Sequence, residues 1–316
     1  MKTLAKLLFF AAFLGLLTNC AKDEIIDESA NELKSGIPPE VNNAQGLDQD
    51  RFIIMDEIDL KVHYRIIGKG PVDIVFITAW TNPLTAYTKQ FDYFREKARC
   101  IYIDLPGHGL SDSPEGIEYT LQLNADAIYD VLKKEGVHKF VAVGSNSAPI
   151  VIGQFERQYP GMITQLVTLA HAMSDPWPKE GPARDARIAA YQNNILMYES
   201  FNDDQKLAQL NMLIPPLSCP SDLIEWGKYF LVFPSWLMAD MQSYITNEEA
   251  CTPVPWNIPI LAIYRTQPNM TRLNLFFPNC DLHVLPNGTS AVIQWQQHEA
   301  VNALIDDFID RPGKKY

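Results

Sequence analysis

The sequence is poor in the residues that would indicate a metal site or a disulfide framework. It has 316 residues but only five cysteines and six histidines, and no cysteine–histidine cluster has zinc-ligand spacing. Basic residues are also scarce: 26 lysines and arginines stand against 38 acidic residues, for a net charge of −12. This balance argues against nucleic acid as a partner. We expect no metal and no other cofactor.

Apolar runs of membrane-spanning length are lacking as well. The apolar run near the amino terminus, 7–17, is shorter than the roughly 20 residues that a membrane span needs. It follows a basic stretch, as in a targeting segment, and the letters LTNC then end at Cys20. This resembles a bacterial lipoprotein cleavage box, although Asn19 stands where glycine or alanine is usual. The resemblance implies a signal peptide over 1–19 and a lipid on Cys20.

An acidic tether is expected over residues 20–50, which show little hydrophobic periodicity. The charged letters KDE directly after Cys20 resemble the tag that sends some Gram-negative lipoproteins to the outer face of the outer membrane. We therefore expect a cell-envelope protein that is anchored in the outer membrane through Cys20. Surface display is the first expectation, and a domain that faces the periplasm is the alternative.

Four cysteines remain after Cys20, and export would place them where disulfides persist. Cys219 and Cys251 lie in one loop-rich region and are the candidate disulfide pair. Cys100 opens an apolar strand and Cys280 precedes another, so both are expected to be buried thiols.

From residue 51 onward, strand-like and helix-like segments alternate. Such alternation predicts an α/β fold with a mostly parallel sheet that is covered by helices on both faces. Expected strands cover 51–55, 61–67, 72–77, 100–104, 140–143, 166–169, 260–263 and 282–285, and expected helices cover 84–97, 121–135, 149–159 and 291–309.

The alternation stops between Met173 and Trp256, where the sequence is helical in pattern and rich in aromatic residues. One interpretation is a packed insertion with a small core of its own. The other is a lid whose apolar underside covers a pocket at the strand ends. The two interpretations are compatible.

A family resemblance rests on the letters IDLPGHGLSD at 103–112, which look like the loop after the fourth strand of α/β-hydrolase-fold proteins. YRIIGKGP at 64–71 and the turn VAVGSNSAPI at 141–150 belong to the same resemblance, which spans about 58–310. It implies an α/β-hydrolase fold for 51–316. Since the family inserts its lid after the sixth strand, it also implies a lid at about 173–256.

In this family the turn after the fifth strand carries the nucleophile, at a residue with positive φ whose neighbours two before and two after are small. Asn146 at the centre has Gly144 and Ala148 as these neighbours. A centre at Ser145 or Ser147 would place valine or proline there instead. Asparagine also tolerates the left-handed region better than serine. We predict Asn146 at the tip of this turn.

The other two triad positions of the family are substituted too. Gln267 stands where an acid is expected, and Thr289 or Ser290 stands where a histidine is expected. An amide is a poor nucleophile, and acyl transfer also needs a proton relay. Backbone N–H groups could still bind an anion or carbonyl at this place. The expected ligand pocket comprises Trp80, Ser145, Asn146, Ser147, His171, Gln267, Thr289 and Ser290.

Three functional hypotheses follow. The leading one is a non-catalytic pseudo-hydrolase lipoprotein that binds a small, partly apolar ligand or a protein partner. The second is an active esterase or amidase that uses Ser145 or Ser147 with His171, which lies near the end of the sixth expected strand, on the side where such sheets bind ligands. The third is a cofactor-free reaction, such as a lyase step, that relies on polar groups and oxyanion donors.

Overall fold

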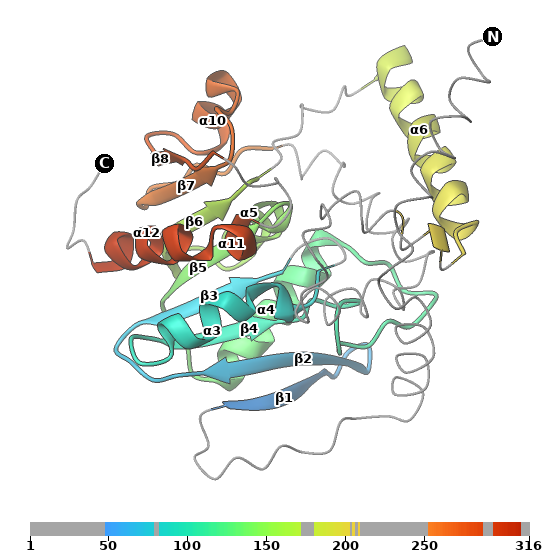
Figure 1. Ribbon diagram of the computed structural model, residues 1–316. Coiled ribbons are helices and arrows are strands. Elements are labelled where there is room, and N and C mark those ends of the chain that lie inside the picture. The colour runs from blue at the N-terminus through green and yellow to red at the C-terminus, as the bar shows by residue number, and fades with distance from the viewer. Residues whose placement is uncertain are drawn as a thin grey trace.

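The computed structural model describes residues 48–78, 82–171, 180–202, 204, 205, 208, 252–286 and 293–310. Its centre is an eight-stranded sheet in the order β1-β2-β4-β3-β5-β6-β7-β8 (Figure 1). β2 pairs antiparallel with both β1 and β4, and the other pairs are parallel. The strands are β1 (Asp48–Met55), β2 (Leu60–Ile67), β3 (Asp73–Ile77), β4 (Arg99–Ile103), β5 (Phe140–Ser145), β6 (Ile163–Leu169), β7 (Ile260–Tyr264) and β8 (Asp281–Val284).

Helices cover both faces of this sheet, as the alternation predicts. Apolar residues of α4, α5 and α10 form one core with the sheet, and those of η2, α3, α11 and α12 form the other. α6 stands apart from the sheet in Figure 1. The helices are η2 (Leu84–Tyr87), α3 (Thr88–Phe94), α4 (Leu121–Lys134), α5 (Ala148–Gln158), α6 (Pro182–Glu199), α10 (Met270–Phe276), α11 (Ile293–Gln296) and α12 (His298–Asp310).

The central strands are apolar on both faces because each face has its own core. In β3, Val75 and Ile77 enter the core with α4 and α5, whereas Ile74 and Phe76 enter the core with α3 and α12. This alternation follows from the two-residue period of a strand. Among the described residues, no helix has the length and apolar character needed to cross a membrane.

The expected strands are all present, but several expected boundaries are wrong. β1 begins at Asp48, inside the expected tether, because Asp48 pairs with Ile67 across the sheet. The helix expected over 84–97 is a 3-10 turn followed by a shorter α-helix. It ends at Phe94, where the N–H groups of Lys97 and Ala98 both donate to the Phe94 carbonyl and the chain turns toward β4.

The closing helix expected over 291–309 is divided into α11 and α12 within its described part. Gln297 lies at the break and donates its side-chain amide to the carbonyls of Leu285 and Pro286. Cys100 is buried as expected, and burial raises its pKa to about 12. Cys280 is only half-buried, because it lies in the turn before the short edge strand β8.

A buried carboxylate ties β2 to the chain that follows β4. Asp104 is 1% exposed. Its Oδ2 accepts hydrogen bonds from His63 Nδ1 at 2.7 Å and from the Leu110 N–H at 3.0 Å, and its Oδ1 accepts one from the Leu84 N–H at 2.6 Å. Gly109 has φ 50°, and a β-carbon there would overlap the Asp104 carboxylate. The loop IDLPGHGLSD is therefore folded around this side chain.

His63 lies between two carboxylates. Its Nδ1 faces Asp104, and its Nε2 lies 3.0 Å from Asp50 Oδ1. Burial alone would lower the pKa of His63, but the hydrogen bonds with Asp104 and Asp50 outweigh burial and raise that pKa to about 9. Burial likewise opposes ionisation of Asp50, yet the hydrogen bonds from His63 and Arg65 hold the Asp50 pKa well below its usual range. The imidazole is thus a cation at neutral pH.

We predict that the His63 contribution to stability is complete below about pH 6.5, the ordinary histidine pKa, and is lost as pH rises through 9. Stability falls with rising pH because the folded state holds the His63 proton more tightly than the unfolded state does. The free energy of unfolding should be measured with urea for the wild type and for His63→Gln across this range. The difference between the two proteins should shrink by about 3 kcal/mol as pH rises. The exposed His138→Gln should leave the wild-type profile unchanged. Parallel pH profiles for wild type and His63→Gln would contradict the assignment.

Candidate functional site

The turn between β5 and α5 has the geometry of a nucleophile elbow. Asn146 takes φ 54°, so its predicted position at the tip of the turn is confirmed. Its N–H donates to the Leu169 carbonyl at 2.8 Å, which ties the turn to the end of β6. The Asn146 side chain is partly exposed. The tip of this turn therefore carries a carboxamide that a ligand can reach.

Close packing explains why small residues flank the tip. A β-carbon at Gly144 would lie 2.6 Å from Ile152 Cδ1 and 3.0 Å from Ala148 Cβ. Such distances force neighbouring atoms to move, so Gly144 allows α5 to approach β5 closely. The requirement is steric and holds whether or not the tip residue is a nucleophile.

The two serines beside Asn146 are buried. Ser145 is 1% exposed and Ser147 is 7% exposed. The Ser145 N–H donates to the Tyr87 hydroxyl at 3.0 Å, and that hydroxyl donates to the Ile77 carbonyl at 2.9 Å. Ser145 Oγ has no hydrogen-bond partner among the described residues. Tyr87 thus supports the elbow from η2, a role that no local pattern in the sequence indicates.

His171 follows β6 by two residues and is bonded to the elbow backbone. Ala170 between them takes φ 50°, and His171 Nδ1 lies 2.6 Å from the Asn146 carbonyl oxygen. Because a carbonyl only accepts, Nδ1 carries the proton. Burial lowers the pKa of His171 to about 4, against the opposing effect of that carbonyl. The ring is therefore neutral at pH 7, with Nε2 unprotonated.

The surroundings of His171 are largely apolar. Its ring meets Phe277 edge-on, with centroids 5.5 Å apart. A cavity of about 20 Å³ beside it is also lined by Ile150, Val254 and Trp256, and has the size of one water molecule. Within the described ranges, no hydrogen bond joins His171 to Ser145 or Ser147. His171 reaches the elbow backbone but is not paired with a serine.

Gln267, at the position of the triad acid, does not join this group. It is exposed in the loop between β7 and α10, and its Nε2 donates to Met270 Sδ at 3.0 Å. The structure thus brings Ser145, Asn146, Ser147 and His171 together and leaves Gln267 outside. The remaining site predictions fall outside the described residues, namely Cys20, Trp80, Cys219, Cys251, Thr289 and Ser290.

A metal centre has no support in the part of the chain that the structure describes. No group of three or more histidine, cysteine, aspartate or glutamate side chains is arranged there to hold a metal ion. The arrangement at the elbow is a set of uncharged hydrogen-bonding groups: one carboxamide, two hydroxyls and a neutral imidazole. Such groups can donate hydrogen bonds to a polar ligand and accept hydrogen bonds from it.

Several known hydrolases are similar to this chain. No protein-family model matches the chain. It is similar to epoxide hydrolase 1 of Caenorhabditis elegans, with 29% identity over 128 residues, which cover 40% of this chain and 31% of the worm protein. The chain therefore spans about a third of that relative.

Longer matches agree with the fold. A 2-hydroxy-6-oxononadienedioate/2-hydroxy-6-oxononatrienedioate hydrolase of Burkholderia vietnamiensis is 23% identical over 286 residues, covering 82% of this chain and 94% of that protein. The crystal structure of a hydrolase from Pseudomonas aeruginosa matches with a TM-score of 0.69 at 16% identity, covering 85% of this chain and all of the other. The chain therefore has the fold of the α/β-hydrolase superfamily, and the curated proteins and solved structure that it resembles here are hydrolases.

Proposed function

We propose that this chain is a non-catalytic member of the superfamily that binds a small, partly apolar ligand, or a protein partner, at the elbow end of the sheet. The observation that carries the proposal is Asn146 at the tip of the turn. Its nitrogen lone pair is delocalised into the carbonyl, so the carboxamide is a poor nucleophile. It both donates and accepts hydrogen bonds, which suits it to hold a carbonyl or carboxylate group.

The surroundings of Asn146 support binding over acyl transfer. A serine hydrolase needs a reachable hydroxyl that is paired with a base. Ser145 Oγ is buried, and His171 donates its Nδ1 proton to the elbow carbonyl. A histidine with a pKa of about 4 is also a weak base at neutral pH. Among the described residues, no specific contact thus favours the serine-hydrolase alternative.

The cellular setting of the proposal comes from the amino-terminal sequence. A signal peptide over 1–19, a lipid on Cys20 and a tether before β1 would hold the domain at the outer membrane. An anchored binding protein would act on molecules at the cell surface or, in the alternative orientation, in the periplasm. The segment expected to form a lid, about 173–256, would cover the bound ligand.

We predict that the chain neither hydrolyses p-nitrophenyl esters nor reacts with a fluorophosphonate probe. Asn146→Ser should also stay inactive, because the family's histidine position holds threonine or serine and His171 is bonded to the elbow carbonyl. Ester turnover measured by absorbance, with mass spectrometry of the labelled peptide, checks both proteins. Labelling of wild-type Ser145 or Ser147 together with turnover would overturn the non-catalytic proposal.

Binding at the elbow is tested by Asn146→Gly. Glycine accepts φ 54° without strain, so this variant removes the carboxamide and preserves the turn. In a thermal-shift screen of medium-chain carboxylic acids, amides and methyl esters, we expect a ligand that raises Tm for the wild type but not for Asn146→Gly. The matched control, Gln267→Asn, changes an exposed amide outside the elbow group and should keep the shift. An equal shift in Asn146→Gly would place the ligand elsewhere.

The anchor is tested by Cys20→Ser in a Gram-negative host. Without the thiol no lipid can be attached, so we expect the domain to move from the membrane fraction to the soluble envelope fraction. Cys100→Ser should leave the wild-type distribution unchanged, since Cys100 lies inside the folded domain. Equal membrane association of Cys20→Ser and wild type, measured by fractionation and blotting, would contradict the lipid anchor.

A further inference from the structure

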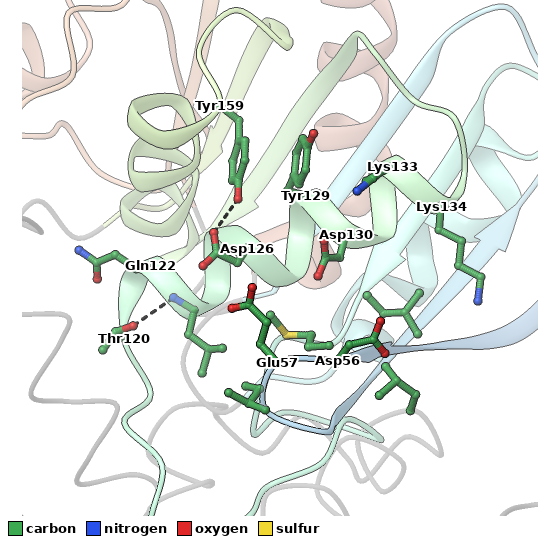
Figure 2. A pocket seen from close by; sticks show the side chains of 15 residues that line it. Asp56, Glu57, Thr120, Gln122, Asp126, Tyr129, Asp130, Lys133, Lys134 and Tyr159 are labelled. Atoms are coloured by element: carbon green, nitrogen blue, oxygen red, sulfur yellow. Dashed lines mark hydrogen bonds between the residues drawn. The ribbon is translucent and has the colours of Figure 1, made fainter.

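A second hollow lies away from the elbow, between the β1–β2 turn and α4 (Figure 2). Its volume is about 1040 Å³, and Asn146 and its neighbours do not line it. The turn at 56–59 forms one wall, and α4 forms the other. Pockets for small ligands usually measure about 300–1,000 Å³ and enclose most of the ligand. An open hollow of this size suits an extended occupant.

Apolar side chains on the turn wall are exposed to solvent. Ile54 is 48% exposed and Ile58 is 43% exposed, and both line the hollow together with Leu123 of α4. Single exposed aliphatic residues are common on protein surfaces, whereas a group that shares one hollow marks a contact surface. The occupant should therefore bring apolar side chains of its own.

Carboxylates line the same hollow from both walls. Asp56 and Glu57 come from the turn, and Asp126 and Asp130 lie one helical turn apart on α4. Figure 2 shows the carboxylates of Asp130 and Glu57 directed into the space between the two walls, whereas the Asp126 carboxylate points toward the Tyr159 hydroxyl. No group of three or more acidic side chains among the described residues is arranged to hold a metal ion. The negative charge is spread along the hollow, which favours an occupant with several separated cations.

The environment of Asp130 shows that this negative charge is incompletely balanced. Burial raises the pKa of Asp130, and the carboxylates of Asp126, Asp56 and Glu57 add to the rise against the opposing Lys133. A second lysine at this end, Lys134, donates to the Phe52 carbonyl at 2.8 Å. A cation placed between the walls would therefore gain attraction from several carboxylates at once.

A stacked pair of aromatic rings completes the lining. The rings of Tyr129 and Tyr159 are parallel, with centroids 3.9 Å apart. The Tyr159 hydroxyl donates to Asp126 Oδ1 at 2.6 Å, which fixes the orientation of that carboxylate. Lysine and arginine side chains pack favourably on aromatic faces and along apolar walls. The wall thus presents carboxylate, aromatic and aliphatic groups side by side.

We propose that this hollow docks a basic segment of another polypeptide, in which lysine or arginine side chains alternate with aliphatic ones. The cations would pair with the carboxylates of both walls, and the aliphatic side chains would cover Ile54, Ile58 and Leu123. The chain's own segment before β1 is a poor occupant, because residues 21–47 carry six acidic residues and two lysines. This docking is independent of ligand binding at the elbow.

Fluorescence anisotropy with labelled synthetic peptides on the full chain tests the proposal. Lys-Leu-Lys-Leu-Lys should bind, whereas Glu-Leu-Glu-Leu-Glu and Lys-Ser-Lys-Ser-Lys should bind about tenfold more weakly or not at all, because each lacks one of the two contributions. The double variant Glu57→Gln/Asp130→Asn should weaken binding about fivefold to tenfold, the sum expected for two partly exposed charge pairs. Ile54→Ser/Ile58→Ser should weaken it similarly.

The matched control neutralises two exposed carboxylates of α12, in Glu299→Gln/Asp310→Asn, and should retain the wild-type affinity. Glu57 and Asp130 accept no hydrogen bond from the described residues, so their amide variants should keep the wild-type Tm. The proposal is overturned if the control weakens binding as much as Glu57→Gln/Asp130→Asn does. It is overturned equally if the lysine–leucine and lysine–serine peptides bind alike, since bulk charge would then explain the affinity.

Discussion

The buried carboxylate of Asp104 is the constraint on which the site end of this molecule depends. A buried carboxylate is costly unless hydrogen bonds and an opposite charge compensate it. His63 on β2 supplies the cation, and the N–H groups of Leu84 and Leu110 supply two further bonds. Leu84 opens η2, whose Tyr87 hydroxyl receives the Ser145 N–H. The position of the elbow thus depends, through η2, on a charge that lies outside the elbow.

The fold and the tip of the turn could be predicted from the sequence because both follow from local rules. Alternating apolar segments predict a parallel sheet with helices on both faces, and the small residues Gly144 and Ala148 allow only one centre for the turn. The Asp104–His63 pair joins residues 41 positions apart, and the period of either strand carries no information about it. The role of Tyr87 could not be predicted from the sequence either, because its hydroxyl lies on η2 and joins two strands, β3 and β5.

The expected pocket is only partly visible in the structure. Asn146, its flanking serines and His171 lie together, and the histidine contributes a bond to the elbow backbone that the sequence does not reveal. Helix boundaries also differ from the expected ones where a side-chain contact or a turn interrupts the helix. At Gln297, for example, the expected closing helix is divided into α11 and α12. The scaffold keeps the steric signature of a catalytic elbow while its tip carries an amide. Packing of α5 on β5 alone is enough to preserve that signature, so the shape of the turn does not imply a reaction.

The direction of β1 has a consequence for how the domain would be presented to its surroundings. β1 runs antiparallel to β2, which runs antiparallel to β4, so β1 points the same way as the strand that leads to the elbow. The chain therefore enters the domain at the amino ends of the strands, and Asn146 lies at the opposite, carboxyl ends. A tether fixed to a membrane at Cys20 would therefore join the domain at the end of the sheet opposite the elbow. The elbow would then lie at the end of the domain opposite its point of attachment.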